Sequence, residues 1–121
     1  MIQDFLKFPS VKSTITQEQV DKILKCTHQN ITFHGYTMEG IDLSNRDLKG
    51  IFFAGILMDN VTFSGSNCQG ASFEYTIMNN INFTDADLRN TIFKEAVISN
   101  TKFTAIKASI WKKIYLHLKN F

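Results

Sequence analysis

Bulky apolar residues occur at every fifth position of this chain, from residue 33 to residue 103. An α-helix needs apolar positions at a period near 3.6 and an ordinary strand needs alternation at a period of two, so a period of five fits neither. The pattern predicts a structural unit of five residues that is repeated along the chain. Its central positions are Phe33, Met38, Leu43, Leu48, Phe53, Met58, Phe63, Cys68, Phe73, Met78, Phe83, Leu88, Phe93, Ile98 and Phe103.

Residue type also repeats at a spacing of twenty, which is four of these units. The columns are Phe33, Phe53, Phe73, Phe93; then Met38, Met58, Met78, Ile98; then Leu43, Phe63, Phe83, Phe103; and then Leu48, Cys68, Leu88, Ala108. A period of twenty predicts a solenoid in which each coil has four short sides and stacks on the coil before it. Burying each Phe, Leu or Met in such columns contributes about 1.5–3 kcal/mol, so the columns can serve as the core.

Several five-residue segments, among them IDLSN, RDLKG, INFTD and ADLRN, resemble pentapeptide repeats, whose usual pattern is roughly A-[DN]-L-x-x. The resemblance implies an all-β solenoid, a right-handed quadrilateral parallel β-helix of about four coils. It also implies that the central residue and the one two places earlier point inward, while the residue just before the centre points outward. Membership of this functionally diverse family does not by itself assign a function.

Three regions are expected within one structural domain: an N-terminal arm and capping helix over residues 1–30, a β-helix over 31–108, and an amphipathic capping helix over 109–121. Thr16 and Gln19 fit a capping box, which predicts a helix over 17–27 that closes the first coil. The arm before this helix contains Ile2, Phe5, Leu6, Phe8 and Val11.

The C-terminal end of the chain is basic, since no acidic residue follows Glu95. The favoured interpretation is a helix that caps the last coil, with its lysines near the helix C-terminus. Contact with an anionic membrane or nucleic acid, or dimerisation through this helix, are the alternatives, although no direct nucleic-acid partner is expected. The candidate basic surface consists of Lys107, Trp111, Lys112, Lys113 and Lys119.

Two polar features accompany the repeat. Asn60, Asn80 and Asn100 fall in one column and are expected to form a hydrogen-bonded ladder along the rod. Arg46 stands in an inward position where the repeat pattern favours Ala, and Tyr36 is large for another such position. Both lie in the first coil, where the N-terminal lid is expected to relax the geometry.

No catalytic constellation is recognised, so the chain is predicted not to be an enzyme and to use no cofactor. Cys26, His28 and His34 are close in sequence, but a second ligand pair of zinc type is lacking and no metal site is expected. The glycines all fall at the fifth position of a unit, where the coil turns a corner.

Charge, cysteine content and targeting signals bear on the cellular setting. The net charge is only +2. Two cysteines without a disulfide pattern, no secretory signal and no transmembrane segment point to the cytoplasm. The alternative is a secreted effector without a classical signal peptide.

The outward positions differ between the sides of the coil. They are polar on the third and fourth sides and largely apolar on the first and second. Because an exposed apolar patch usually marks an interface, these residues form a candidate interface for a protein partner or a homodimer. The alternative is that the N-terminal arm folds back over them. The candidate interface consists of Phe52, Leu57, Ile77, Ile92 and Val97.

The sequence therefore predicts a non-enzymatic protein–protein interaction or scaffold module. The resemblance suggests one alternative, a DNA-mimicking binder of gyrase or topoisomerase of the quinolone-resistance type. Such mimicry needs a long and strongly negative rod, whereas Lys102 and Lys107 reverse the sign of their columns. A further alternative is a bacterial effector or a fragment of one.

Overall fold

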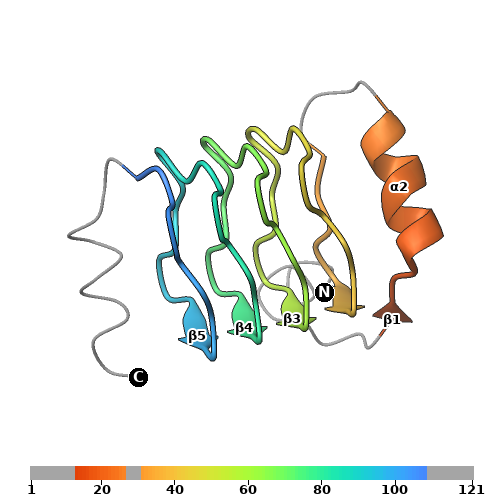
Figure 1. Cartoon of the computed structure of the whole chain (residues 1–121). Helices are drawn as coiled ribbons and strands as arrows, with labels where there is room; N and C mark the ends of the chain where they lie inside the picture. Colours follow the sequence, from red (N-terminus) through yellow and green to blue (C-terminus); the bar gives the residue numbers. More distant parts are fainter. Residues whose placement is uncertain (1–12, 27–30, 109–121) are drawn as a thin grey trace.

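The computed structural model describes residues 13–26 and 31–108 of the chain. The elements are strand β1 (Ser13–Thr14), helix α2 (Gln17–Lys25) and strands β2 (Tyr36–Glu39), β3 (Leu57–Asp59), β4 (Ile77–Asn79) and β5 (Val97–Ser99). The strands form one parallel sheet in the order β1-β2-β3-β4-β5 and lie along the lower edge of the molecule in Figure 1.

The pairing of the backbone confirms the twenty-residue period. Met58 pairs with Met38 in one direction along the sheet and with Met78 in the other. Three further parallel pairings per coil join the other sides, for example Thr32 with Phe52, Asp42 with Thr62, and Asp47 with Asn67. Each coil therefore has four sides that pair with their equivalents twenty residues away, which makes the molecule a parallel β-helix solenoid.

The corners of the coil lie at every fifth residue, and each corner has a positive φ. The six glycines occupy corners with φ between 66° and 89°, and non-glycine residues occupy the other nine with φ between 49° and 62°. Asn60, Asn80 and Asn100 are among them. Asn tolerates the left-handed conformation better than most residues, so backbone geometry accounts for this column of asparagines.

The expected asparagine ladder has a different pairing from the one predicted. The Asn100 side chain donates to Asn79 Oδ1 at 2.9 Å, and the Asn80 side chain donates to Asp59 Oδ1 at 3.3 Å. The corner amides of Asn80 and Asn100 thus bond the residue just before the corner of the preceding coil.

The core consists of two stacked columns of phenylalanine rings that meet edge to face. Phe53 and Phe73 are parallel with centroids 5.0 Å apart, and Phe63 and Phe83 are parallel at 4.9 Å. Between the columns, Phe63 contacts Phe73 at 5.5 Å with an interplanar angle of 88°. These are the favourable arrangements of aromatic pairs, and they confirm that the central residues point inward.

Inward polar side chains find partners in the backbone. Thr76 Oγ1 donates to the Phe53 carbonyl at 2.8 Å, Ser66 Oγ to Phe63 at 2.6 Å, and Thr91 Oγ1 to Cys68 at 3.2 Å. In the described part of the chain, no buried side-chain polar atom lacks a hydrogen-bond partner. The narrow core accepts these hydroxyls because burying a polar group is costly only when it is unpaired.

Helix α2 begins at a capping box, as predicted, and ends two residues earlier than predicted. Thr16 accepts from the Gln19 backbone at 3.1 Å, and the Gln19 side chain accepts from the Thr16 backbone at 2.9 Å. Cys26 already has an extended backbone with ψ of 125°. Val20 is fully buried, with Ile23 and Leu24 packed against the core, so the helix presents its apolar side to the first coil (Figure 1).

The side chain of Gln17 makes the hydrogen bonds that a preceding coil would otherwise make. Its Nε2 donates to the Asp42 carbonyl at 3.0 Å, and its Oε1 accepts from the Asp42 backbone N–H at 2.7 Å. In the next coil, the equivalent Thr62 has the same two bonds with backbone atoms, donating to Ile41 and accepting from Leu43. The carboxamide of Gln17 therefore takes the place of a backbone peptide group at the N-terminal end of the third side.

The unexpected Arg46 at an inward position is explained by its contact with helix α2 at the same end of the rod. It is partly exposed, and its guanidinium lies 2.8 Å from the Asp21 carboxylate of α2. The inward position that favours Ala thus holds an Arg whose charge reaches the helix. The expected C-terminal helix over 109–121 lies outside the described residues.

Candidate functional site

Reactive chemistry is limited in the described residues. Within them, no three His, Cys, Asp or Glu side chains are grouped so that they could hold a metal ion, and His28 lies outside them. Burial raises the pKa of the Cys68 thiol from 9.0 to about 12, so this thiol is neutral and unreactive at physiological pH. The described part of the chain contains no helix long and apolar enough to cross a membrane.

On the polar sides, the outward side chain has a structural role. Its oxygen accepts a hydrogen bond from the backbone N–H two residues later, which holds the following turn. Asp42 accepts from Ser44 at 2.9 Å, and Asn82 accepts from Thr84 at 2.9 Å. The same bond recurs on these sides at Asp47, Thr62, Asn67 and Asp87, and it is also formed on the first side by Thr32 and Ser72.

Carboxylates in this position are also held in their charged form. Hydrogen bonds from Ser44 lower the pKa of Asp42 below its ordinary value. Arg89 bonds both carboxylate oxygens of Asp87, at 2.9 and 2.7 Å, and lowers the pKa of Asp87 in the same way. These acids are therefore already engaged with their own turns.

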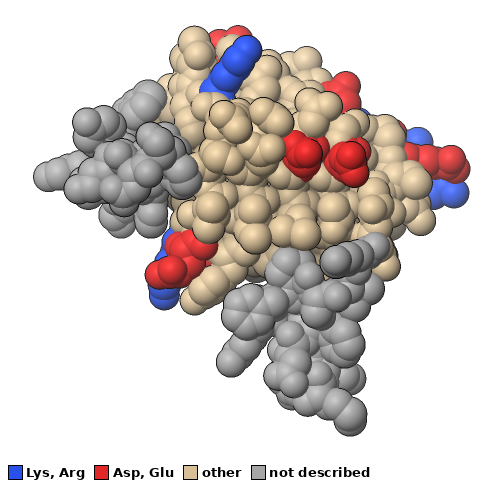
Figure 2. Space-filling view, turned by 90° about the horizontal axis from the view of Figure 1, so that it is seen from below, with Lys and Arg blue, Asp and Glu red and all other residues tan. Residues whose placement is uncertain are grey.

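The candidate interface lacks this role, because an apolar side chain has no oxygen with which to hold a turn. Phe52, Ile77, Ile92 and Val97 are exposed by 44–54%, whereas Leu57 is only partly exposed. These five residues occupy the outward positions of the first and second sides. Figure 2 views the molecule from the side of strands β2 to β5, where most of the visible described surface is uncharged.

Tyr75 is a member of this surface that the sequence analysis missed. It occupies the corner between the first and second sides and is 48% exposed. The signal was present in the sequence, since a bulky residue stands at a corner where Gly, Asn or Asp is usual. We call Tyr75 and the five candidate interface residues together the apolar strip: Phe52, Leu57, Tyr75, Ile77, Ile92 and Val97.

The backbone is strained beside the apolar strip. Tyr75 has φ of 57° and Glu95, one coil later at the same corner, has φ of 58°. Such a conformation is uncommon outside Gly, Asn and Asp and has an energetic cost. Gly35 and Gly55 occupy this corner in the first two coils without that cost. The fold would therefore accept glycine at position 75, and the side chain of Tyr75 is not needed to form the corner.

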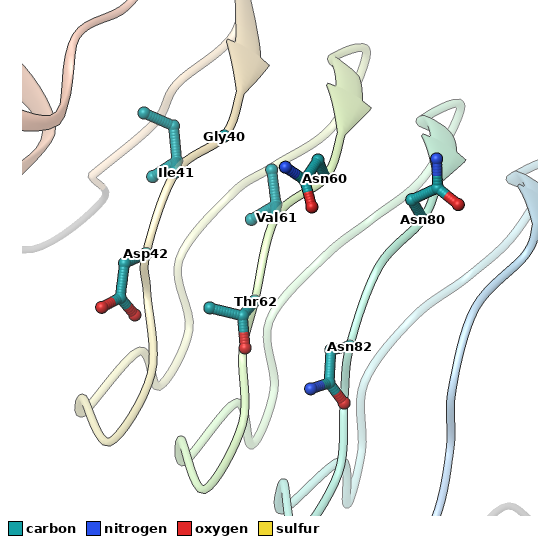
Figure 3. Close-up of a pocket in the computed structure, with 8 residues that line it drawn as sticks. All are labelled: Gly40, Ile41, Asp42, Asn60, Val61, Thr62, Asn80 and Asn82. Atoms are coloured by element: carbon teal, nitrogen blue, oxygen red, sulfur yellow. The ribbon is translucent and has the colours of Figure 1, made fainter.

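Two shallow hollows accompany these surfaces. One, of about 320 Å³, lies on the second side, and its lining includes the apolar Leu57 and Ile77 and the acidic Glu39 and Asp59. The other, of about 370 Å³, is lined by side chains from successive coils (Figure 3). In the second hollow Asp42, Thr62 and Asn82 already hold turns, so the polar lining has few groups left for a ligand.

The candidate basic surface falls mostly outside the described residues. Lys107 is exposed, and its backbone pairs with Asp87 of the coil before it. Trp111, Lys112, Lys113 and Lys119 lie in the region that is not described.

Comparison with known proteins supports the repeat assignment. A sequence model of pentapeptide repeats matches residues 66–104 in eight copies, and the backbone pairings extend the same register over residues 31–108. No curated protein matches the chain significantly.

A solved structure has the same fold. The chain is similar to a pentapeptide repeat protein from the cyanobacterium Cyanothece 51142, with 22% sequence identity and a TM-score of 0.57. The match covers 67% of this chain and 57% of the length of that protein. The eight matched repeats, the parallel coils and this structural likeness together support assignment of the chain to the pentapeptide-repeat family.

Proposed function

We propose that this protein is a non-enzymatic protein–protein interaction module whose binding surface is the apolar strip. The observation that carries the proposal is that some outward side chains hold turns by a hydrogen bond, whereas others are apolar and form none. On the third and fourth sides most of these side chains hold turns. On the first and second sides five of the eight are apolar and form no such bond, and four of these five are exposed, whereas Thr32 and Ser72 of the first side hold turns. Exposed apolar residues that the fold does not need are typical of an interface.

The shape of the rod suits this role. Parallel coils about 4.8 Å apart present outward side chains in straight columns, which gives a flat and rigid surface. Ile77 and Val97 pair directly in adjacent strands, so their side chains lie next to each other on the second side. A rigid apolar surface loses little conformational entropy when it binds.

We assign helix α2 the role of N-terminal cap. The buried Val20, the paired carboxamide of Gln17 and the ion pair between Arg46 and Asp21 support this role. A cap prevents an open sheet edge from pairing with another molecule. Binding would then occur along the sides of the rod rather than at this end.

The proposal is tested by affinity capture with three baits. The first is the unaltered chain. The second is a strip variant, Phe52→Asn with Ile77→Thr and Ile92→Asn, which uses residue types already found in outward positions at Asn67, Asn82 and Thr37. The third is a control on the third side, Thr62→Asn with Asn82→Thr.

We expect a partner that the unaltered chain and the control retain and the strip variant loses. Identical captured proteins for all three baits would contradict the proposal. Light scattering over a range of concentrations decides whether the partner is a second copy, because a constant monomer mass excludes the homodimer.

The DNA-mimic alternative is less well supported. Residues 31–108 contain eight acidic and six basic residues, so the rod is only weakly negative. Asp42 and Asp87 are bonded within their own turns. We expect no inhibition in a gyrase supercoiling assay at micromolar protein, and inhibition there would favour the alternative. In the described residues we find no feature that favours the effector hypothesis.

A further inference from the structure

The apolar strip lies at the point where the N-terminal segment joins the rod. Strand β1 is parallel to β2, and Ser13 pairs with Tyr36, the residue that follows the corner at Gly35. This corner belongs to the same column as Gly55, Tyr75 and Glu95. The chain before Ser13 therefore enters the described structure at the corner between the first and second sides, where the apolar strip lies.

The segment before Ser13 is long enough to follow the strip. Twelve residues reach at most about 40 Å when extended. The four strand spacings from β1 to β5 together measure roughly 19 Å. The segment can therefore pass the whole strip even if it is far from fully extended.

The composition of this segment complements the strip. Six of its twelve residues are apolar, namely Met1, Ile2, Phe5, Leu6, Phe8 and Val11. Such residues are stabilised when they leave water, by about 1.5–3 kcal/mol for a fully buried large side chain. The exposed Tyr75, Ile77 and Ile92 lie three to four coils further along the rod, at or beside the same corner column, and their apolar surface would also be stabilised by leaving water.

We propose that residues 1–12 bind along the apolar strip of the same molecule as an intramolecular strap, which a partner must displace. The part of this inference that concerns the partner rests on the proposed function, whereas the docking of the strap does not. A tethered segment has a high effective concentration near its site, so it competes well with a free second copy. The strap would keep the strip out of water until a partner with greater affinity arrives.

Trypsin cleavage after Lys7 tests the strap in the full chain. Lys7 lies between Leu6 and Phe8, so docking of these neighbours protects the bond. The rate is measured by mass spectrometry for the unaltered chain, the strip variant and the third-side control. We expect cleavage in the strip variant to be faster by about tenfold or more, because cleavage follows the population of the undocked state. The control is expected to match the unaltered chain.

Two results would overturn the strap. Equal cleavage rates in all three proteins would show that the segment does not lie on the strip. Protection of the unaltered chain that disappears on dilution would show that a second copy provides it.

A second measurement does not depend on altering the strip. A spin label at Ser10→Cys, in a Cys26→Ser background, is expected to broaden the methyl signals of Ile77, Ile92 and Val97 more than that of Thr62 on the third side. Equal broadening would contradict the strap. Failure of the strap leaves the capture experiment unaffected, and failure of capture with a protected Lys7 bond would contradict only the proposed function.

Discussion

The third side and the first side of the coil are opposite faces of one rod, yet they use the same outward position differently. On the third side Asp42, Thr62 and Asn82 accept a backbone hydrogen bond and hold a turn. On the first side Thr32 and Ser72 hold turns in the same way, whereas Phe52 and Ile92 form no such bond and are exposed by 44% and 45%. The fold therefore tolerates the loss of these turn bonds. Because Phe52 and Ile92 do not hold the turns, we attribute their presence to binding rather than to the formation of the coil.

Both sides depend on the same core, so the largest effect is expected there. Phe73→Asp should unfold the rod, because Phe73 is fully buried between Phe53 and Phe93. Truncating a buried Phe costs about 3–5 kcal/mol, and a buried unpaired charge adds to this cost. Circular dichroism measures the loss of structure. Thr62→Asp, with the same charge at an outward position, is the control and should remain folded, and a folded Phe73→Asp protein would refute the inward assignment.

The next effect concerns the end of the third side, where Gln17 completes the pairing of Asp42. Gln17→Met removes both hydrogen bonds and leaves the Asp42 N–H without its partner, while the Asp42 carbonyl keeps the bond from Arg46 Nη2 at 3.2 Å. We expect the free energy of unfolding to fall by about 1–3 kcal/mol, as measured by urea denaturation. Glu18→Met in the exposed part of the same helix is the control. Equal losses in the two variants would mean that the carboxamide does not replace a coil.

A smaller effect is expected at a turn of the third side. Asn82→Val removes the acceptor of the bonds from the Thr84 backbone and hydroxyl, at 2.9 and 2.6 Å. The unfolding free energy should fall by about 0.5–1.5 kcal/mol. Val97→Thr on the second side, where Val97 is 54% exposed, should change it by about 0.5 kcal/mol or less. Should both variants lose the same stability in urea, the distinction between the sides would be lost.

The smallest effect is the response to acid. The pKa values of Asp42 and Asp87 lie below the ordinary 3.8 in the folded protein, because Ser44 and Arg89 donate hydrogen bonds to them. These acids therefore stabilise the fold above pH 3.8, and the stabilisation is lost as the pH falls through their folded pKa values. Melting temperatures measured from pH 6 to pH 2 should decrease at the acidic end. Asp87→Asn should make that decrease shallower, and an unchanged slope would argue against its contribution.

The core could be predicted from the sequence because each ring repeats at a fixed spacing. Phe53 and Phe73 lie twenty residues apart and stack, as the period requires. The capping box at Thr16 was predictable for the same reason, since its partners are only three residues apart.

Other features depend on contacts that no spacing reveals. Gln17 and Asp42 are twenty-five residues apart and belong to different elements, so their pairing appears only when α2 is placed on the coil. The asparagine column was found, but its cause, the left-handed corner, is a property of the folded backbone. Tyr75 was missed because it stands at a corner, and the repeat pattern assigns outward side chains only to the position just before each central residue. Its exposure and its unusual φ became visible together only in the structure.

Photo-crosslinking from the two kinds of side tests the central claim most directly. A photoreactive amino acid is placed in the full chain at position 77 or 97 on the second side, or at 62 or 82 on the third, and the products are identified after illumination in cells. The account predicts links from 77 and 97, to residues 1–12 or to another protein, and few from 62 and 82. Equal links from all four positions, or links from the third side alone, would contradict it.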